Sequence, residues 1–133
     1  MEKLEHIGIA VRNLDESNQL FAKLLGKAHY KIEEVASEGV RTSFFDLNGV
    51  KIELLEATHA DSPIAKFIEK RGEGVHHLAF EVRNIADSIH AYTEKGFSIL
   101  NPEPKAGADN KIIAFMHPKS ANGVLVELCQ EKK

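Results

Sequence analysis

An internal repeat constrains the fold of this chain more than any other feature of its sequence. Residues 4–14 read LEHIGIAVRNL, and residues 75–85 read VHHLAFEVRNI. The match consists of a histidine, an alternation of apolar and other residues, and then Val-Arg-Asn followed by an aliphatic residue. His6 therefore corresponds to His77.

A second match lies further along each half. Residues 48–54 read NGVKIEL, and residues 122–128 read NGVLVEL, so Glu53 corresponds to Glu127. Two matches in the same order indicate two modules of similar length. Each module has a histidine near its start and a glutamate near its end.

The hydropathy pattern predicts β-α-β-β-β for each module. In the first module, Asn13 with Glu16 three residues later predicts the start of a helix that ends at Gly26. Asn48-Gly49 is a strong hairpin signal. We expect the strands of this module at residues 3–11, 29–36, 42–47 and 50–57.

The second module is predicted in the same way. A strand at 74–82 leads into a helix over 85–95, which follows Asn84 and ends at Gly96. Residues 102–110 have no period and read as an irregular loop. The remaining strands are expected at 97–100, 111–117 and 124–130.

The domain prediction is a single domain over residues 1–133. Module one covers about 1–58, a linking helix about 61–72, and module two about 74–133. Within the linking helix, Ser62-Pro63 is typical of a helix start and Gly72 of a helix end.

Composition excludes several classes of function. The net charge of −3 argues against nucleic acid as a partner, and no apolar run approaches the roughly 20 residues of a membrane helix. The first residues do not resemble a secretion signal, so we expect a cytoplasmic protein. The single cysteine, Cys129, is expected to be a small apolar residue rather than a nucleophile.

Strand alternation predicts which way the repeated residues point. His6 lies opposite the apolar face of Ile7 and Ile9, and Glu53 lies between Ile52 and Leu54. In the second module, His77 and Glu127 hold the equivalent places. Taken singly, these residues read as ordinary histidines and solvent-facing glutamates, but a pseudo-twofold axis between equivalent modules would bring two His–Glu pairs together.

Such a cluster favours a metal site. Two carboxylates held close together repel one another, and a divalent cation is the simplest way to neutralise them. Two imidazoles and two carboxylates suit zinc, nickel, cobalt or manganese, and six-coordinate geometry leaves two positions open for substrate. We expect His6, Glu53, His77 and Glu127 to bind one ion at a catalytic site.

These residues resemble the vicinal oxygen chelate superfamily (glyoxalase/bleomycin resistance/dioxygenase), and the resemblance covers almost the whole chain. Three segments, residues 6–11, 61–77 and 117–128, look like the methylmalonyl-CoA epimerases of that superfamily. The resemblance implies an α+β fold of two tandem β-α-β-β-β modules related by a pseudo-twofold, which form a mixed-sheet metal-binding cup. It also implies a homodimer.

The same resemblance implies site roles. His6, His77 and Glu127 match metal ligands of the family, and Glu53 falls where some epimerases have Gln. Certain bacterial epimerases have a second carboxylate base where this chain has Thr42. Lys119, in a turn, is a candidate for binding a phosphate or carboxylate of a thioester substrate.

The function that the resemblance implies is epimerisation of methylmalonyl-CoA by removal and return of the α-proton, with Glu127 as the first candidate base and Glu53 as the second. Glyoxalase I, which isomerises a glutathione hemithioacetal, is the main alternative. An extradiol dioxygenase is disfavoured by the fourth ligand. A non-catalytic binding module is disfavoured because it has no use for four ligands.

Overall fold

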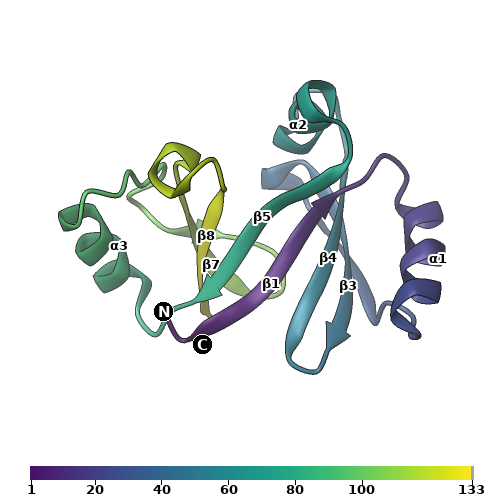
Figure 1. Ribbon diagram of the computed structural model, residues 1–133, viewed down its shortest axis with the longest axis horizontal. Helices are drawn as coiled ribbons and strands as arrows, with labels where there is room; N and C mark the ends of the chain where they lie inside the picture. The colour runs from purple at the N-terminus through teal and green to yellow at the C-terminus, as the bar shows by residue number, and fades with distance from the viewer. Residues whose placement is uncertain (133) are drawn as a thin grey trace. The chain divides into compact units, whose positions relative to one another are not determined.

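The computed structural model describes residues 1–132 and contains two compact units (Figure 1). The N-terminal unit comprises His6–His76. The C-terminal unit comprises Met1–Glu5 and residues 77–132. No helix in residues 1–132 is both long and apolar enough to cross a membrane.

The N-terminal unit has the predicted β-α-β-β-β order, followed by a further helix. Its hydrogen-bonded strands run in the order β2-β3-β4-β1, with β1 parallel to β4 and the other pairs antiparallel. Its elements are β1 (Lys3–Ala10), which begins in the C-terminal unit, α1 (Leu14–Leu25), β2 (Lys31–Val35), the short helix η1 (Ala36–Glu38), β3 (Val40–Leu47), β4 (Val50–Ala57) and α2 (Pro63–Arg71).

The C-terminal unit repeats this topology. Its strands run in the order β5-β8-β7-β6, with β5 parallel to β8 and the other pairs antiparallel. Its elements are β5 (Gly74–Glu81), which begins in the N-terminal unit, α3 (Ile85–Glu94), β6 (Lys105–Ala106), β7 (Lys111–Met116), the short helix η2 (Pro118–Ala121) and β8 (Val126–Glu131). The predicted pair of β-α-β-β-β modules is confirmed.

The predicted helix starts are also confirmed. The Asn13 side chain accepts a hydrogen bond from the Glu16 N–H, and the Asn84 side chain accepts one from the Asp87 N–H. Each bond satisfies a backbone donor that the first turn of a helix leaves without a partner. At the other end of α1, Gly26 adopts a left-handed conformation with φ of 77°.

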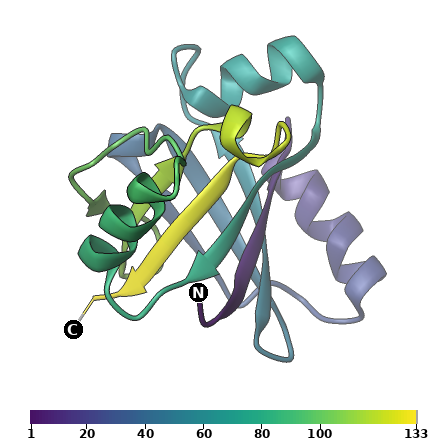
Figure 2. The same cartoon turned by 60° about the vertical axis from the view of Figure 1, so that its left-hand side comes forward.

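Each helix of a module covers the apolar face of its own strands. Beneath α1, Leu14 packs with Phe45 and Leu54, and all three side chains are fully buried. Beneath α3, Ile89 packs in one cluster with Leu128 and Ala114. Figure 2 turns α3 toward the viewer. The linking helix α2 packs through Ile64 on the opposite face of the N-terminal strands.

The predicted strand at 97–100 is wrong. Ile99 makes only an isolated bridge with Met116, and the chain then turns away at Pro102. The Asn101 side chain accepts from the Phe115 N–H at 2.8 Å and donates to the Ile113 carbonyl at 3.3 Å, so a side chain replaces the next backbone pairing. The edge strand is instead β6, inside the segment predicted to be an irregular loop.

Candidate metal and proton-transfer site

The N-terminal unit brings His6 and Glu53 together as predicted. His6 Nδ1 lies 3.1 Å from Glu53 Oε2, and the two residues expose only 4% and 3% of their surface. Gly8 on β1 lies opposite Glu53 on β4 in the parallel ladder, so His6, Gly8 and Glu53 share one face of the strands. Gly8 has no side chain, so no bulky group stands beside the imidazole and the carboxylate at this position of β1.

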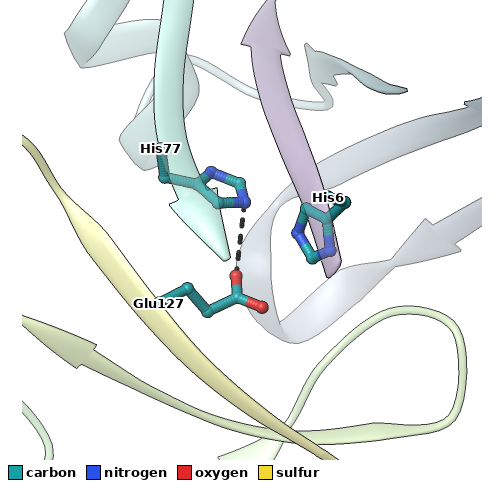
Figure 3. A group of neighbouring side chains, drawn as sticks. All are labelled: His6, His77 and Glu127. Atoms are coloured by element: carbon teal, nitrogen blue, oxygen red, sulfur yellow. Dashed lines mark ion pairs between the residues drawn. The ribbon is translucent and has the colours of Figure 1, made fainter. Parts of the chain in front are cut away.

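The C-terminal unit contains the equivalent pair. His77 Nε2 lies 3.3 Å from Glu127 Oε1, and Figure 3 shows His77 on β5 facing Glu127 on β8. Each residue exposes 5% of its surface. The small residue opposite Glu127 in this ladder is Ala79, at the place that Gly8 holds in the other unit.

An aromatic residue lies opposite each glutamate, and the sequence reasoning missed both. Phe44 on β3 pairs with Glu53, and Phe115 on β7 pairs with Glu127. The Phe115 ring also meets the His77 ring edge to face at 6.0 Å. Alignment of the two modules on His6 and His77 would have placed Phe44 over Phe115, so the repeat itself held the signal.

Each pair fits two neighbouring ligands of one metal ion. Donor atoms that bind an ion at roughly 2.0–2.2 Å and at a right angle lie about 3 Å apart. The nitrogen–oxygen distances of 3.1 Å and 3.3 Å match that spacing. Imidazole and carboxylate together are donors for borderline and hard divalent ions.

His76 lies next to a site residue but belongs to the packing of α2. Its ring meets Phe67 edge to face at 5.0 Å. Burial lowers the pKa of His76 to about 4, so its imidazole is neutral at physiological pH. A neutral ring adds no positive charge beside the adjacent histidine.

Lys119 lies in the turn before β8, where η2 places it at the surface. Its backbone N–H donates to His117 Nδ1 at 3.0 Å, so His117 caps this short helix. The exposed lysine side chain remains a candidate for binding an anionic group. Cys129 is fully buried, which agrees with its expected role as a small apolar residue, and its Sγ lies 3.6 Å from the Phe80 carbonyl.

Thr42 is the residue that stands where the resemblance places a second base. It is fully buried on β3, and its partner across the ladder is Leu55. A threonine hydroxyl does not serve as a carboxylate-type base. Glu53 is the acidic side chain of this unit that lies 3.1 Å from His6.

Comparison with known proteins identifies the family of this chain. The family model of the Glyoxalase/Bleomycin resistance protein/Dioxygenase superfamily matches residues 5–115. The chain belongs to this superfamily. The predicted membership is thus confirmed.

Several relatives are named methylmalonyl-CoA epimerase. The mitochondrial methylmalonyl-CoA epimerase of Dictyostelium discoideum is 40% identical over 127 residues, which cover 95% of this chain and 76% of the relative. A solved methylmalonyl-CoA epimerase in complex with methylmalonyl-CoA and NH4+ is 33% identical, with a TM-score of 0.95 over 98% of this chain and 95% of the other.

A second similar structure is a single-residue variant of the Streptomyces coelicolor methylmalonyl-CoA epimerase in complex with 2-nitronate-propionyl-CoA. It is also 33% identical, with a TM-score of 0.95 over 98% of this chain and 95% of that one. These comparisons confirm the predicted fold class and the prediction of an epimerase-like enzyme.

Proposed function

We propose that this protein interconverts the stereoisomers of methylmalonyl-CoA by removing the α-proton and returning a proton to the opposite face. The observation that carries the proposal is the occurrence of one buried His–Glu pair at equivalent positions of both units. Its relatives that are named methylmalonyl-CoA epimerase agree with this chemistry.

We further propose that His6, Glu53, His77 and Glu127 together hold one divalent ion: cobalt, nickel, zinc or manganese. The support is the donor set and the spacing within each pair, which matches two neighbouring ligands of an ion. When bound, such an ion supplies Lewis-acid polarisation of the thioester carbonyl, which makes the α-proton easier to remove.

The two glutamates have complementary roles in this proposal. Glu127 enters the step as a carboxylate and takes the α-proton from one face of the substrate, while Glu53 enters it protonated and returns its proton from the other face, so that Glu127 ends protonated and Glu53 ionised. In the reverse direction the roles exchange. Low exposure of both carboxylates keeps bulk water from protonating the carbanionic substrate without control of the face.

Three further assignments belong to the same proposal. The exposed Lys119 binds an anionic group of the thioester substrate, such as a phosphate. The two units act as one domain, and the protein is a cytoplasmic homodimer like those that the superfamily resemblance implies.

Solvent-exchange labelling tests this function. The protein loaded with one equivalent of cobalt is incubated with methylmalonyl-CoA in heavy water, and the α-position is followed by NMR. We expect rapid deuterium incorporation, and none with protein stripped of metal. The glutathione hemithioacetal of methylglyoxal is tested in parallel. Turnover of the hemithioacetal without labelling of methylmalonyl-CoA would overturn the proposal in favour of a glyoxalase.

A pair of histidine variants tests the site itself. His77→Ala is expected to abolish both stoichiometric metal binding and labelling, because it removes a ligand. The control is His90→Ala, which changes an exposed histidine that pairs with Glu94 on the surface of α3. Full metal content and full labelling in His77→Ala would show that the ligand set is wrong.

A further inference from the structure

Thr42 has a buried hydroxyl with no hydrogen-bond partner within residues 1–132. Its Oγ1 is one of three such side-chain atoms there, and the residue exposes none of its surface. A buried hydroxyl without a partner has lost its hydrogen bonds to water and gained none in return, so a chain that keeps one is less stable than it could be. Valine has the same shape without this cost.

The hydroxyl belongs to a residue on the face that holds His6 and Glu53. Thr42 pairs with Leu55, which is two residues after Glu53 on β4, and side chains two apart share a face. Thr42 is therefore a diagonal neighbour of Glu53 across the ladder. His6 and Glu53 are themselves only 4% and 3% exposed. The Thr42 side chain is therefore about as deeply buried as the two residues of the pair.

Folding does not require a hydroxyl at this position. The ladder partners Phe44–Glu53 and Phe115–Glu127 align the two units, and this alignment places Ile113 where the N-terminal unit has Thr42. Ile113 is 5% exposed and packs with Ala79 and Cys129. The same fold thus accepts an aliphatic side chain at the equivalent place.

The other two unpartnered groups lie on the opposite side of the strands. Ser43 pairs with Leu54, which packs beneath α1, and Asn18 is a buried residue of α1 itself. Both face the packed interior under the helix rather than the side that holds His6 and Glu53. Ser43 is consequently a matched control for Thr42: an adjacent buried hydroxyl that is also without a partner within residues 1–132, on the other face.

We propose that the Thr42 hydroxyl donates a hydrogen bond to an anionic oxygen of the substrate after the α-proton has been removed. This inference rests on the proposed epimerase function and assigns a further substrate-binding residue to it. The ligand class is an acyl-CoA whose α-carbon carries a delocalised negative charge. A hydrogen bond to a charged oxygen is stronger than one to the neutral thioester, so Thr42 favours the deprotonated form.

The test compares Thr42→Val with Ser43→Ala by calorimetry, with 2-nitronate-propionyl-CoA as the anionic probe and methylmalonyl-CoA as the ground-state probe. Loss of a hydrogen bond to a charged group corresponds to about a 10- to 100-fold weaker binding of the nitronate. We expect that loss in Thr42→Val, a smaller change for methylmalonyl-CoA, and unchanged affinities in Ser43→Ala.

Thermal unfolding without ligand supplies a second readout. Thr42→Val is expected to raise the unfolding midpoint by about 3–6 °C, because it removes an unsatisfied polar group without leaving a cavity. A merely structural threonine would instead lower it. Thr42→Ser keeps the hydroxyl and is expected to bind the nitronate as tightly as the unaltered protein does.

The outcomes separate this inference from the function on which it rests. Equal nitronate affinity in Thr42→Val and the unaltered protein would overturn the inference alone. Nitronate binding that is equally weakened in Thr42→Ser and Thr42→Val would also overturn it, because loss of the methyl group or of the side-chain shape would then be the cause. Unaltered protein that binds neither compound would overturn the proposed function, and this inference with it.

Discussion

The N-terminal and C-terminal units share a strand topology but differ in the length of their edge strands and in some of their side chains. Both have one parallel strand pair, an asparagine-capped helix and a buried His–Glu pair. They differ at the edge strand, which spans Lys31–Val35 in one and only Lys105–Ala106 in the other. The shared features are those that hold the His–Glu pair in place.

A second difference lies next to the site histidines. The residue before His77 is His76, which packs against Phe67, whereas the residue before His6 is Glu5. Glu5 is 2% exposed and lies 4.0 Å from the Lys111 ammonium group. The residue before the site histidine is thus a neutral ring in the second module and a carboxylate close to a lysine in the first. The two modules are therefore more alike in their His–Glu pairs than in the residues next to them.

The largest expected difference between the units is in proton transfer. Glu127→Gln should lower the rate of α-proton exchange by about 10²- to 10⁴-fold, because an amide cannot accept the proton. The metal content should stay near one ion, since the amide oxygen remains a ligand. Glu53→Gln is the matched variant in the other unit, and we expect it to lose less. Parallel loss of metal and exchange in Glu127→Gln would make this residue structural.

The cores of the two units can be compared with one leucine from each. Leu54 and Leu128 are fully buried under α1 and α3, respectively. Leu54→Ala and Leu128→Ala should each lower the free energy of unfolding by about 2–5 kcal/mol. Urea titration followed by far-UV circular dichroism measures this. A single transition in both variants would support one cooperative domain, whereas two transitions in either would show that the units unfold separately.

Acid should affect the two units differently through His76. Its pKa is about 4 in the folded protein and 6.5 when unfolded, so the unfolded chain binds the proton more readily. The stability that depends on a neutral His76 is complete above pH 6.5 and is lost as the pH falls toward 4. The loss is at most about 3–4 kcal/mol, at 1.36 kcal/mol per pKa unit. His76→Phe should remove this part of the acid sensitivity in urea titrations, and the exposed His90→Phe should not.

The smallest expected effect concerns the two helix caps. Asn13→Ala and Asn84→Ala should each cost about 0.5–2 kcal/mol, because each leaves one backbone N–H of the first turn without its acceptor. Asn13→Asp and Asn84→Asp keep the acceptor and should be close to neutral. A cost confined to one unit would show that the other helix start is held by other contacts, such as the Gln130 side chain that accepts from the Ile85 N–H.

Local signals in the sequence predicted much of this structure. Alternation, asparagine caps and the Asn48-Gly49 turn depend on neighbouring residues only, and the structure has them where they were expected; Asn48 and Gly49 both take positive φ values, 51° and 99°. The β4 bounds, Val50–Ala57, match the prediction. The repeat also identified His6 with Glu53 and His77 with Glu127 as partners, because equivalent strands present equivalent faces.

Other features depended on tertiary structure. The edge strand β6 forms in a segment without strand periodicity, because β7 offers it backbone partners while Asn101 ends the pairing upstream. The unsatisfied hydroxyl of Thr42 is likewise invisible in the sequence, where threonine is an ordinary strand residue. Sequence by itself determined the repeated modules and the His–Glu pairs, since these follow from local periodicity. Tertiary structure alone decided which polar groups lack a partner, because burial and hydrogen bonding depend on residues distant in the chain.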